Sequence, residues 1–563
     1  MRGRSTFDIQ IRHGDRWVTE SRMEGEEEAK ALALKHLKSA KCQGARVLRC
    51  WLRTDGTEDE TEIFSKIQQV REESSSHIDF IESAGELCED LQDYFKPGSR
   101  LVLGRLFRSY LDKAVLTPSE LLHNGRELKR LRDKDALMPS AVDRIASLQA
   151  RSAGVDVAAR KGQLFKAVED LIALARKTES VALPKQTMSV AELFAALPPG
   201  AAPWEREYLA CTALARDLQE VRSFSAKLER LCRLALDVAD PGQIALMDSL
   251  IAELLETSAI QDVLGWQPGL GHAICSLLDL ADGTMATTKS DAPEAAQLLN
   301  RLFAEQRLPA CRLGLIDRAH RQIAAASPLY RSDEKQEYDT FKKVVQRMLT
   351  PAGLLGNAAT AAALTTRCLH MIKDGGRKGA VAAVFRAMPD RAYGILYLCG
   401  LADGEFADEA AGKLAEAYPP GIGGQHITNI VHRTLSPKDR MVRATAAYRA
   451  VAAAPFPGAV KQPLLDHIDR LLDEYLVEEK VIEKLDNPEG RLRDRALRLV
   501  QFCASGVLPE GKALSRARQR IRDLLRQPNF DAHFVEGIGD PAKARQALRD
   551  FHQLLVNKAG FSV

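Results

Sequence analysis

The first hydrophobic pattern in the chain is a strict alternation in which Phe7, Ile9 and Ile11 are separated by polar residues. This period of two predicts a β-strand with one buried face. Turn residues follow, and a second strand over residues 17–19 would complete a hairpin. We therefore predict a small N-terminal α+β module over residues 1–65, with the element order ββαββ. Its later elements are a helix over residues 25–39, a strand over 45–52 and a strand over 61–64.

From residue 66 onward the apolar residues recur at alternating steps of three and four, which is the spacing of a heptad repeat. This pattern predicts a long amphipathic helix over residues 67–95, although Ser74 and His77 weaken its apolar seam. Further apolar residues widen the face beyond a strict seam, which favours packing against the same chain. The alternative is an intermolecular coiled coil, in which the 67–95 helix would form a homodimer.

The remainder of the chain reads as a series of helices with recognisable ends. Capping boxes begin at Thr117 and Ser189, where a hydroxyl residue precedes a glutamate by three positions. Residues 226–239 and 243–257 are both amphipathic, and the sequence Asp-Pro-Gly at residues 240–242 joins them as an αα-hairpin. The predicted fold class is therefore mainly α, a multi-helix array with a small N-terminal α+β module.

Two arrangements of the array remain open. Similar helix-ending sequences recur at spacings near ~40 residues, which would suit a helical-repeat fold of the HEAT or armadillo type. Because such residues end helices in general, an irregular bundle is an equal alternative. A stretch over residues 181–203 holds four of the 24 prolines and is interpreted as a hinge or linker. It would separate a helical domain over residues 66–180, which begins with the heptad-bearing helix, from a larger α-helical array over residues 204–563.

Composition narrows the class of protein. The chain has 79 basic and 76 acidic residues, and this balance gives no general attraction to nucleic acid or to an anionic membrane. The ten cysteines are scattered singly between Cys42 and Cys503, which indicates small buried side chains instead of a disulfide framework. The first residues lack the apolar region of a secretory signal, and no apolar run is long enough to span a bilayer. We expect a cytoplasmic protein without a membrane span.

Three glycine-containing sequences resemble phosphate-binding loops. Residues 506–512 match the spacing G-x-x-x-x-G-K, but Ala513 stands where a P-loop needs Ser or Thr, and a helix precedes the glycine instead of a strand. Residues 421–424 follow the end of a helix and are interpreted as a turn. The basic loop over residues 375–379 could contact a phosphate or an acidic partner, but a glycine helix cap beside solvated charges is the simpler interpretation.

No other arrangement of side chains in the sequence predicts a chemical site. His426 and His432 form the closest histidine pair, yet on a helix they would point to different sides and would lack a completing ligand. Neither a nucleophile elbow nor a local cysteine signature is present. We therefore predict no catalytic, cofactor-binding or metal-binding residues.

Four residues are candidates for contact with a partner. Trp17 and Trp51 of the N-terminal module could form an exposed aromatic surface, although packing in the core of a small sheet is the simpler interpretation. Arg377 and Lys378 of the basic glycine loop could bind an acidic group.

Basic helices are the remaining feature that bears on partners. Residues 513–526 carry five arginines on both flanks of an apolar arc, which is typical of a helix packed on a core with its arginines reaching along the surface. A dedicated nucleic-acid surface would concentrate the arginines opposite the core. Nucleic acid is therefore not expected as a partner.

The sequence favours a non-enzymatic scaffold or signalling adaptor, in which a helical array and the N-terminal recognition module bind protein partners. One alternative is an enzyme whose site is assembled in space among the helices, with the loops at residues 375–379 and 421–426 as the first places to look. A second alternative is a nucleic-acid-binding protein that uses the basic helices. No cofactor is expected.

Overall fold

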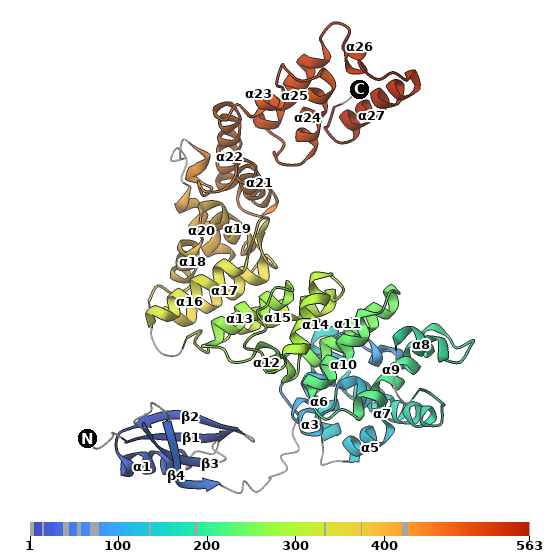
Figure 1. Ribbon diagram of the computed structural model, residues 1–563, viewed down its shortest axis with the longest axis vertical. Coiled ribbons are helices and arrows are strands. Elements are labelled where there is room, and N and C mark those ends of the chain that lie inside the picture. Colours follow the sequence, from blue (N-terminus) through green and yellow to red (C-terminus); the bar gives the residue numbers. More distant parts are fainter. Residues whose placement is uncertain are drawn as a thin grey trace. The chain divides into compact units, whose positions relative to one another are not determined.

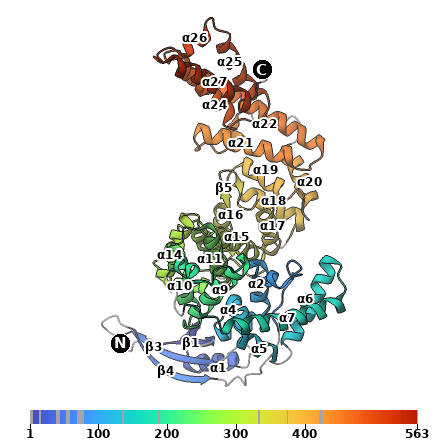
Figure 2. The same cartoon turned by 90° about the vertical axis from the view of Figure 1, so that its right-hand side faces the viewer.

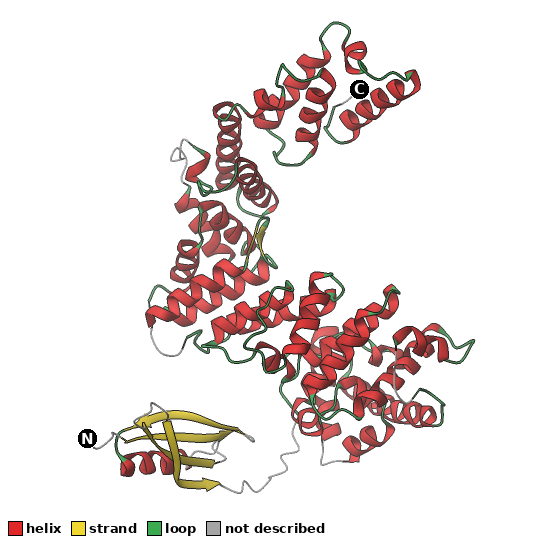
Figure 3. Ribbon diagram, viewed as in Figure 1, coloured by secondary structure: helices red, strands yellow, loops and turns green. Residues whose placement is uncertain are grey.

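The computed structural model describes residues 5–13, 16–37, 44–52, 58–67, 78–133, 137–184, 189–330, 334–372, 374–418 and 426–561. In these residues it contains a four-stranded sheet near the N-terminus and 27 α-helices (Figure 1; Figure 3). The mainly α fold class with a small N-terminal α+β module is therefore confirmed. Contacts divide the chain into two compact units, one formed by Met1–Ile78 with Lys129–Ile145 and the other by Asp79–Leu128 with Ala146–Val563.

The N-terminal module has the predicted order of elements. β1 (Ser5–His13) and β2 (Arg16–Met23) form a hairpin, α1 (Glu26–Leu37) follows, and β3 (Gly44–Leu52) and β4 (Glu58–Ile67) complete an antiparallel sheet with strand order β2-β1-β3-β4. The alternation at the start of the chain exists because one sheet face is covered by α1. The buried residues of this shared core are Phe7, Ile9, Ile11, Ala29, Ala33, Leu37, Ala45 and Val47.

The predicted heptad helix over residues 67–95 is wrong for the part of this range that the structure describes. β4 continues to Ile67, and the residues from 78 to 90 contain no helix. Gly85 has a φ of +68°, a left-handed conformation that an α-helix cannot contain. The Asp79 carboxylate accepts hydrogen bonds from the backbone and the hydroxyl of Ser109, so it is tied to a later helix. Residues 68–77, including Ser74 and His77, lie outside the described residues.

Two of the apolar residues behind the heptad spacing are buried in this irregular segment. Ile81 is 5% exposed and Cys88 is 8% exposed, although neither belongs to a helix. A short 3-10 helix, η1 (Leu91–Phe95), then leads into the helical part of the chain. The first helices after it are α2 (Pro97–Leu106), α3 (Arg108–Ala114), α4 (Pro118–Leu122), α5 (Gly125–Asp133), α6 (Leu137–Ala153) and α7 (Val157–Glu179).

The range interpreted as a linker, residues 181–203, contains the helix α8 (Val190–Ala196). The Ser189 hydroxyl accepts from the Glu192 backbone N–H at 3.2 Å, so the serine half of the predicted capping box is confirmed. Leu193 is buried in the same hydrophobic core as α9 (Pro203–Gln219). A domain boundary at this place stays a prediction.

Five helices of the second unit stack in a row, each packed on the next (Figure 2). They begin at irregular intervals, so the described helices form a stacked array without a constant repeat length. In chain order they are α11 (Pro241–Leu255), α15 (Pro309–Ala324), α17 (Ala358–Met371), α19 (Arg391–Gly400) and α21 (Pro437–Ala453).

Other helices pack beside this row. α10 (Phe224–Leu236) packs on α11 and forms the predicted αα-hairpin, with the Asp240 side chain capping α11. The remaining elements before α21 are α12 (Ala259–Leu264), α13 (Leu270–Ala281), α14 (Pro293–Ala304), α16 (Glu334–Arg347), β5 (Leu349–Thr350), β6 (Gly353–Leu354), α18 (Gly376–Ala387), α20 (Ala407–Ala417) and η2 (Ile427–Asn429). Those after it are α22 (Gly458–Glu478), α23 (Val481–Leu485), α24 (Leu492–Ala504), α25 (Lys512–Leu525), α26 (Phe530–Phe534) and α27 (Pro541–Asn557).

A buried aspartate on one helix twice caps the N-terminus of a helix packed against it. Asp248 of α11 accepts from the backbone N–H groups of Ala310 and Cys311 at the start of α15, at 2.7 and 2.9 Å. Asp469 of α22 accepts in the same way at the start of α25. These carboxylates satisfy N–H groups that have no partner within their own helix, and they fix the position of one helix on another.

Candidate functional site

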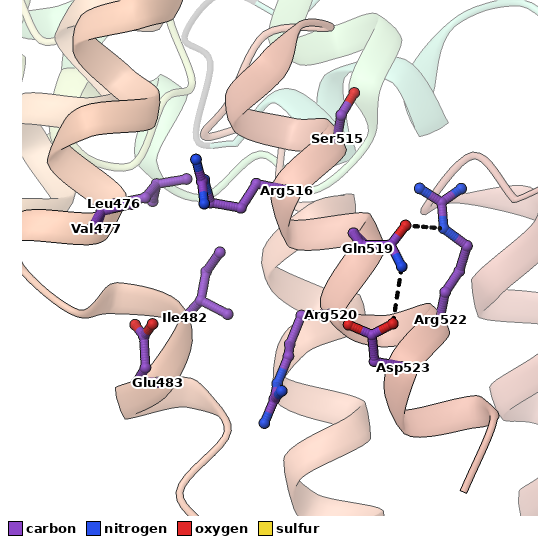
Figure 4. A pocket seen from close by; sticks show the side chains of 10 residues that line it. All are labelled: Leu476, Val477, Ile482, Glu483, Ser515, Arg516, Gln519, Arg520, Arg522 and Asp523. Carbon is purple, nitrogen blue, oxygen red and sulfur yellow. Dashed lines mark hydrogen bonds between the residues drawn. The ribbon is translucent and has the colours of Figure 1, made fainter.

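An open groove lies between the C-terminal end of α22, α23 and α25, with a volume of about 530 Å³ (Figure 4). Leu476, Val477 and Ile482 form one wall, and the Val477 side chain is 50% exposed. The other wall is the polar face of α25, and Glu483 adds a carboxylate beside Ile482. The side chains that α25 contributes are those of Ser515, Arg516, Gln519, Arg520, Arg522 and Asp523.

Two arginines of the groove are fixed in place by carboxylates. Arg516 donates from both Nε and Nη2 to Asp473, at 2.5 and 2.8 Å, and this hydrogen bonding raises the pKa of its guanidinium. Arg520 donates from Nε to Asp486 at 2.5 Å. The Asp486 side chain is fully buried and also accepts from Arg495 at 2.7 Å, so one carboxylate joins two arginines. Fixed guanidinium groups lose little side-chain entropy when they bind a ligand.

Both fixed arginines still reach solvent. The Arg516 side chain is 49% exposed and the Arg520 side chain is 45% exposed. Along the same helix the Gln519 amide donates to Asp523 at 2.9 Å and accepts from Arg522 at 3.0 Å (Figure 4). The groove thus combines one exposed apolar residue, Val477, with donors and acceptors held in known positions. Such a surface can bind a segment of another protein through one apolar side chain and several polar ones.

The interpretation of residues 513–526 as a core-packed helix is confirmed. Ala517 and Ile521 of α25 are buried, and the arginines beside them are largely engaged within the molecule. Arg518, for example, donates to both Glu510 carboxylate oxygens, at 2.7 and 2.8 Å, and to the Ala559 carbonyl. Ion pairs of this kind neutralise charge that a phosphate backbone would otherwise meet.

The P-loop-like residues 506–512 connect two helices, as expected from the sequence. Asp469 takes the place that a phosphate would need, because its carboxylate accepts from the Lys512 N–H at 2.7 Å and from the Ala513 N–H at 3.3 Å. The same carboxylate lies 2.4 Å from the position of a Cβ on Gly511. The N-terminus of α25 is therefore already occupied by an anion of the protein itself.

Arg377 and Lys378 lie at the start of α18, where Arg377 contacts other side chains and Lys378 is exposed. Arg377 donates from Nε to Glu409 at 3.0 Å, and its guanidinium lies 4.4 Å from the Phe406 ring centroid. It therefore holds α18 against the start of α20. Gly375 has a φ of +94° and is the residue before α18, so it is not the C-terminal cap of a helix that was expected.

Trp17 and Trp51 lie on opposite faces of the sheet. Trp17 stands opposite Arg12 on β1 and Trp51 stands opposite Ser5, so strand alternation separates the two indoles. The Arg46 guanidinium lies 4.7 Å from the Trp17 ring centroid. Both tryptophans are half-buried, and they do not form one aromatic surface.

His426 and His432 do not approach each other as ligands. His426 Nδ1 lies 3.2 Å from Glu478, whereas His432 Nδ1 hydrogen-bonds Thr434 at 2.7 Å. Across the described ranges, no group of three or more His, Cys, Asp and Glu side chains could hold a metal ion. Residues 421–424 lie outside the described residues.

A buried polar network that no sequence pattern predicts joins α4 to α10 and α11. Ser119 donates to Glu253 from its backbone at 2.9 Å and from its hydroxyl at 2.7 Å. Arg100 lies 3.2 Å from the same carboxylate, and its guanidinium donates to Ser119 and Ser249. Glu120, the last residue of the predicted capping box, accepts from Lys227 at 2.6 Å.

This network is a structural element of the second unit. Ser119, Arg100 and Glu253 are at most 3% exposed, and Glu120 and Lys227 are at most 1% exposed. The hydroxyl and carboxylate oxygens are used by neighbouring donors, and a buried ion pair is retained where each charge has partners. Helices α10 and α11 thus fix the position of α4 through hydrogen bonds to its backbone and its side chains.

A smaller hollow of about 460 Å³ lies between the residues before η1 and α7. Arg160 of α7 is its most deeply placed charge, with 5% exposure. Its guanidinium donates to the side chains of Gln149 and Gln163 and to the Cys88 carbonyl, all within 3.0 Å. Arg160 therefore anchors the irregular segment that replaces the predicted heptad helix.

Comparison with known proteins gives no match, because no protein-family model, no curated protein and no solved structure is significantly similar to this chain. Within the part of the chain that the structure describes, no helix is both long enough and apolar enough to cross a membrane.

Proposed function

We propose that this chain is a scaffold or adaptor that binds a segment of a partner protein in the groove between α22, α23 and α25. The observation that carries the proposal is the half-exposed Val477, which lines the same groove as two exposed arginines that carboxylates already hold. An apolar contact surrounded by fixed polar groups is the common anatomy of a protein interface.

The chemistry of the groove favours binding over catalysis or nucleic-acid recognition. Arg516 and Arg520 keep their carboxylate partners, so the groove is a mixed-charge surface and not a basic one. A partner segment would place an apolar side chain on Val477 and satisfy the exposed edges of the two guanidinium groups. The N-terminal module would then be free to bind a second partner.

The test is affinity purification of the tagged full chain from the cells that produce it, in parallel with two variants. Val477→Asp places a charge on the apolar wall of the groove, and Val556→Asp makes the same change on α27, where Val556 is 40% exposed. We expect one or more proteins to be recovered with the wild type and with Val556→Asp and to be depleted at least about tenfold with Val477→Asp. Equal recovery with all three proteins would contradict the proposal.

A further inference from the structure

Trp266 is a large exposed side chain on a surface that the proposed groove does not include. It is 69% exposed and lies in the turn between α12 and α13. Tryptophan is enriched among the residues that dominate binding at protein interfaces. The exposed indole of Trp266 is therefore a candidate contact for a partner.

The turn that carries Trp266 is held on both sides. Gly265 has a φ of +63°, and a Cβ at this position would lie 1.7 Å from the Lys289 carbonyl oxygen, so the two backbone segments touch. The Asp262 carbonyl accepts from the Asp291 N–H at 2.8 Å, which ties the same two segments together. The Gln267 side chain donates to the Leu264 carbonyl at 2.8 Å and closes the turn. A side chain presented from a fixed turn loses little conformational entropy when it is covered.

The groups around Trp266 are basic and aromatic. The Lys289 ammonium lies 5.9 Å from the indole ring centroid. His272, whose ring lies 6.2 Å from that of Tyr330, has its pKa lowered by burial and then by the positive charges of Lys343 and Lys289. The charged groups that act on His272 are thus both cations. We name Trp266, His272, Lys289, Tyr330 and Lys343 the Trp266 surface.

We infer that the Trp266 surface docks an acidic segment of a partner protein, with a large apolar side chain of that segment on the indole and carboxylates on Lys289 and Lys343. Charge complementarity selects the class of partner, since Lys289 lies beside the exposed indole and acts together with Lys343 on His272, and a carboxylate that lies at Tyr330 is already in use. That carboxylate, Glu337, accepts from the Leu329 and Tyr330 backbone N–H groups at 2.9 and 2.5 Å. The inference shares the interaction function proposed for the groove but uses a different surface.

A protein segment fits this surface better than a nucleic acid does. The Lys289 ammonium lies 5.9 Å from the indole centroid, so a carboxylate bound to Lys289 would lie beside the apolar side chain that covers the ring. The cations are lysines, which act as point charges, and the surface has no arginine fork aimed at it for a phosphate. A partner segment with a carboxylate next to an apolar side chain can pair with the lysines and cover the indole at the same time.

The test is selection of phage-displayed random 12-residue peptides on the full chain, followed by fluorescence anisotropy with the enriched peptides. We expect the enriched peptides to be acidic and to contain a large apolar residue. Trp266→Ala should weaken their binding by about 30-fold, as for an interface hot spot, and Lys289→Glu by about tenfold. Leu313→Ala, at another exposed apolar side chain, and Lys438→Glu, at another exposed lysine, should change binding less than about twofold.

Each other outcome has a defined meaning. A lack of enriched peptides, enrichment of basic or uncharged peptides, or equal losses in the control variants would overturn the inference. Tighter binding of a 12-nucleotide oligothymidine that Trp266→Ala abolishes would also overturn it, in favour of nucleic acid. Trp266→Phe, which keeps an aromatic ring, should bind within about fivefold of wild type and guards against a folding defect. Val477→Asp should leave peptide binding unchanged, so failure of the groove and failure of the Trp266 surface are distinguishable.

Discussion

His123 offers a quantitative test of the packing around α4. His123 is 7% exposed, and its ring packs against those of Phe95 and Tyr208, with ring centroids at 5.3 and 4.4 Å. The Thr212 hydroxyl donates to the Tyr208 carbonyl, so the His123 Nδ1–H must donate to the Thr212 oxygen, at 2.9 Å. Burial, and then the positive charge of Arg100, lower the pKa of His123 from 6.5 to about 3.

The sign of the pH dependence follows from this lowered pKa. The unfolded chain binds a proton near pH 6.5 and the folded chain does not, so the contribution of His123 is fully present above pH 6.5 and is lost progressively as the pH falls toward 3. At 1.36 kcal/mol per pH unit, the loss between pH 6.5 and pH 5 is about 2 kcal/mol. His123→Gln stays neutral over this range and keeps an amide donor for Thr212.

The assay is hydrogen exchange measured by mass spectrometry across a urea series, on peptides that cover α4 and α9. A local measurement is needed because a chain of this length does not unfold as one cooperative unit. We expect the unfolding free energy of the wild type to fall by about 2 kcal/mol more than that of His123→Gln between pH 7.5 and pH 5. The same pH dependence in both proteins would refute the description of His123 as a buried neutral ring.

Three further predictions, each with its own substitution, test other parts of the fold. Asp469→Ala should lower the unfolding free energy of α25 by about 1–3 kcal/mol, because buried N–H groups lose their acceptor, whereas the exposed cap variant Ser436→Ala should cost about 1 kcal/mol; hydrogen exchange in α25 and α21 reads out both. Lys227→Met should cost about 3–5 kcal/mol by leaving Glu120 buried without its partner, and the double variant with Glu120→Gln should recover part of it; a double variant no better than Lys227→Met would contradict the ion-pair account. Gly265→Ala should lower the melting temperature and alter the Trp266 fluorescence, since its φ and the nearby carbonyl both exclude a Cβ; an unchanged spectrum and melting temperature would count against the fixed turn.

The features that the sequence predicts well are those determined by neighbouring residues. The alternation of Phe7, Ile9 and Ile11 predicts the first strand because the strand period is a local property. The capping box at Thr117 predicts the start of α4 because a capping side chain lies three residues before the N–H that it accepts from. Both predictions are confirmed.

The heptad interpretation of residues 67–95 fails for a physical reason. Steps of three and four describe which residues are apolar, and a tertiary core can bury such residues without a helix. Ile81 and Cys88 are buried in the folded chain, and Gly85 between them has a left-handed backbone conformation that no continuous helix contains. In the sequence, a single glycine such as Gly85 is weak evidence against a helix when the apolar residues around it keep a helical spacing.

The candidate sites depend on contacts that no local pattern contains. Arg100 donates to Ser249 across 149 residues of chain, and Arg516 donates to Asp473 across 43. In the sequence Val477 belongs to no motif, and only the structure shows that half of its side chain is left open next to fixed arginines. The sequence did predict that α25 packs on the core with arginines on both flanks of its apolar face, because the position of a residue around a helix is a local property.

The most direct measurement of the central claim is site-specific photocrosslinking from the groove in intact cells. A photoreactive phenylalanine analogue at Val477 would report on the groove, and the same analogue at Val556 on α27 would be the control. We predict that light attaches the Val477 analogue to one dominant protein, through a single short segment, and that Arg516→Glu in the same chain removes this product. If the two positions give the same products, or if the Val477 analogue gives none, the groove is not where this protein binds a partner.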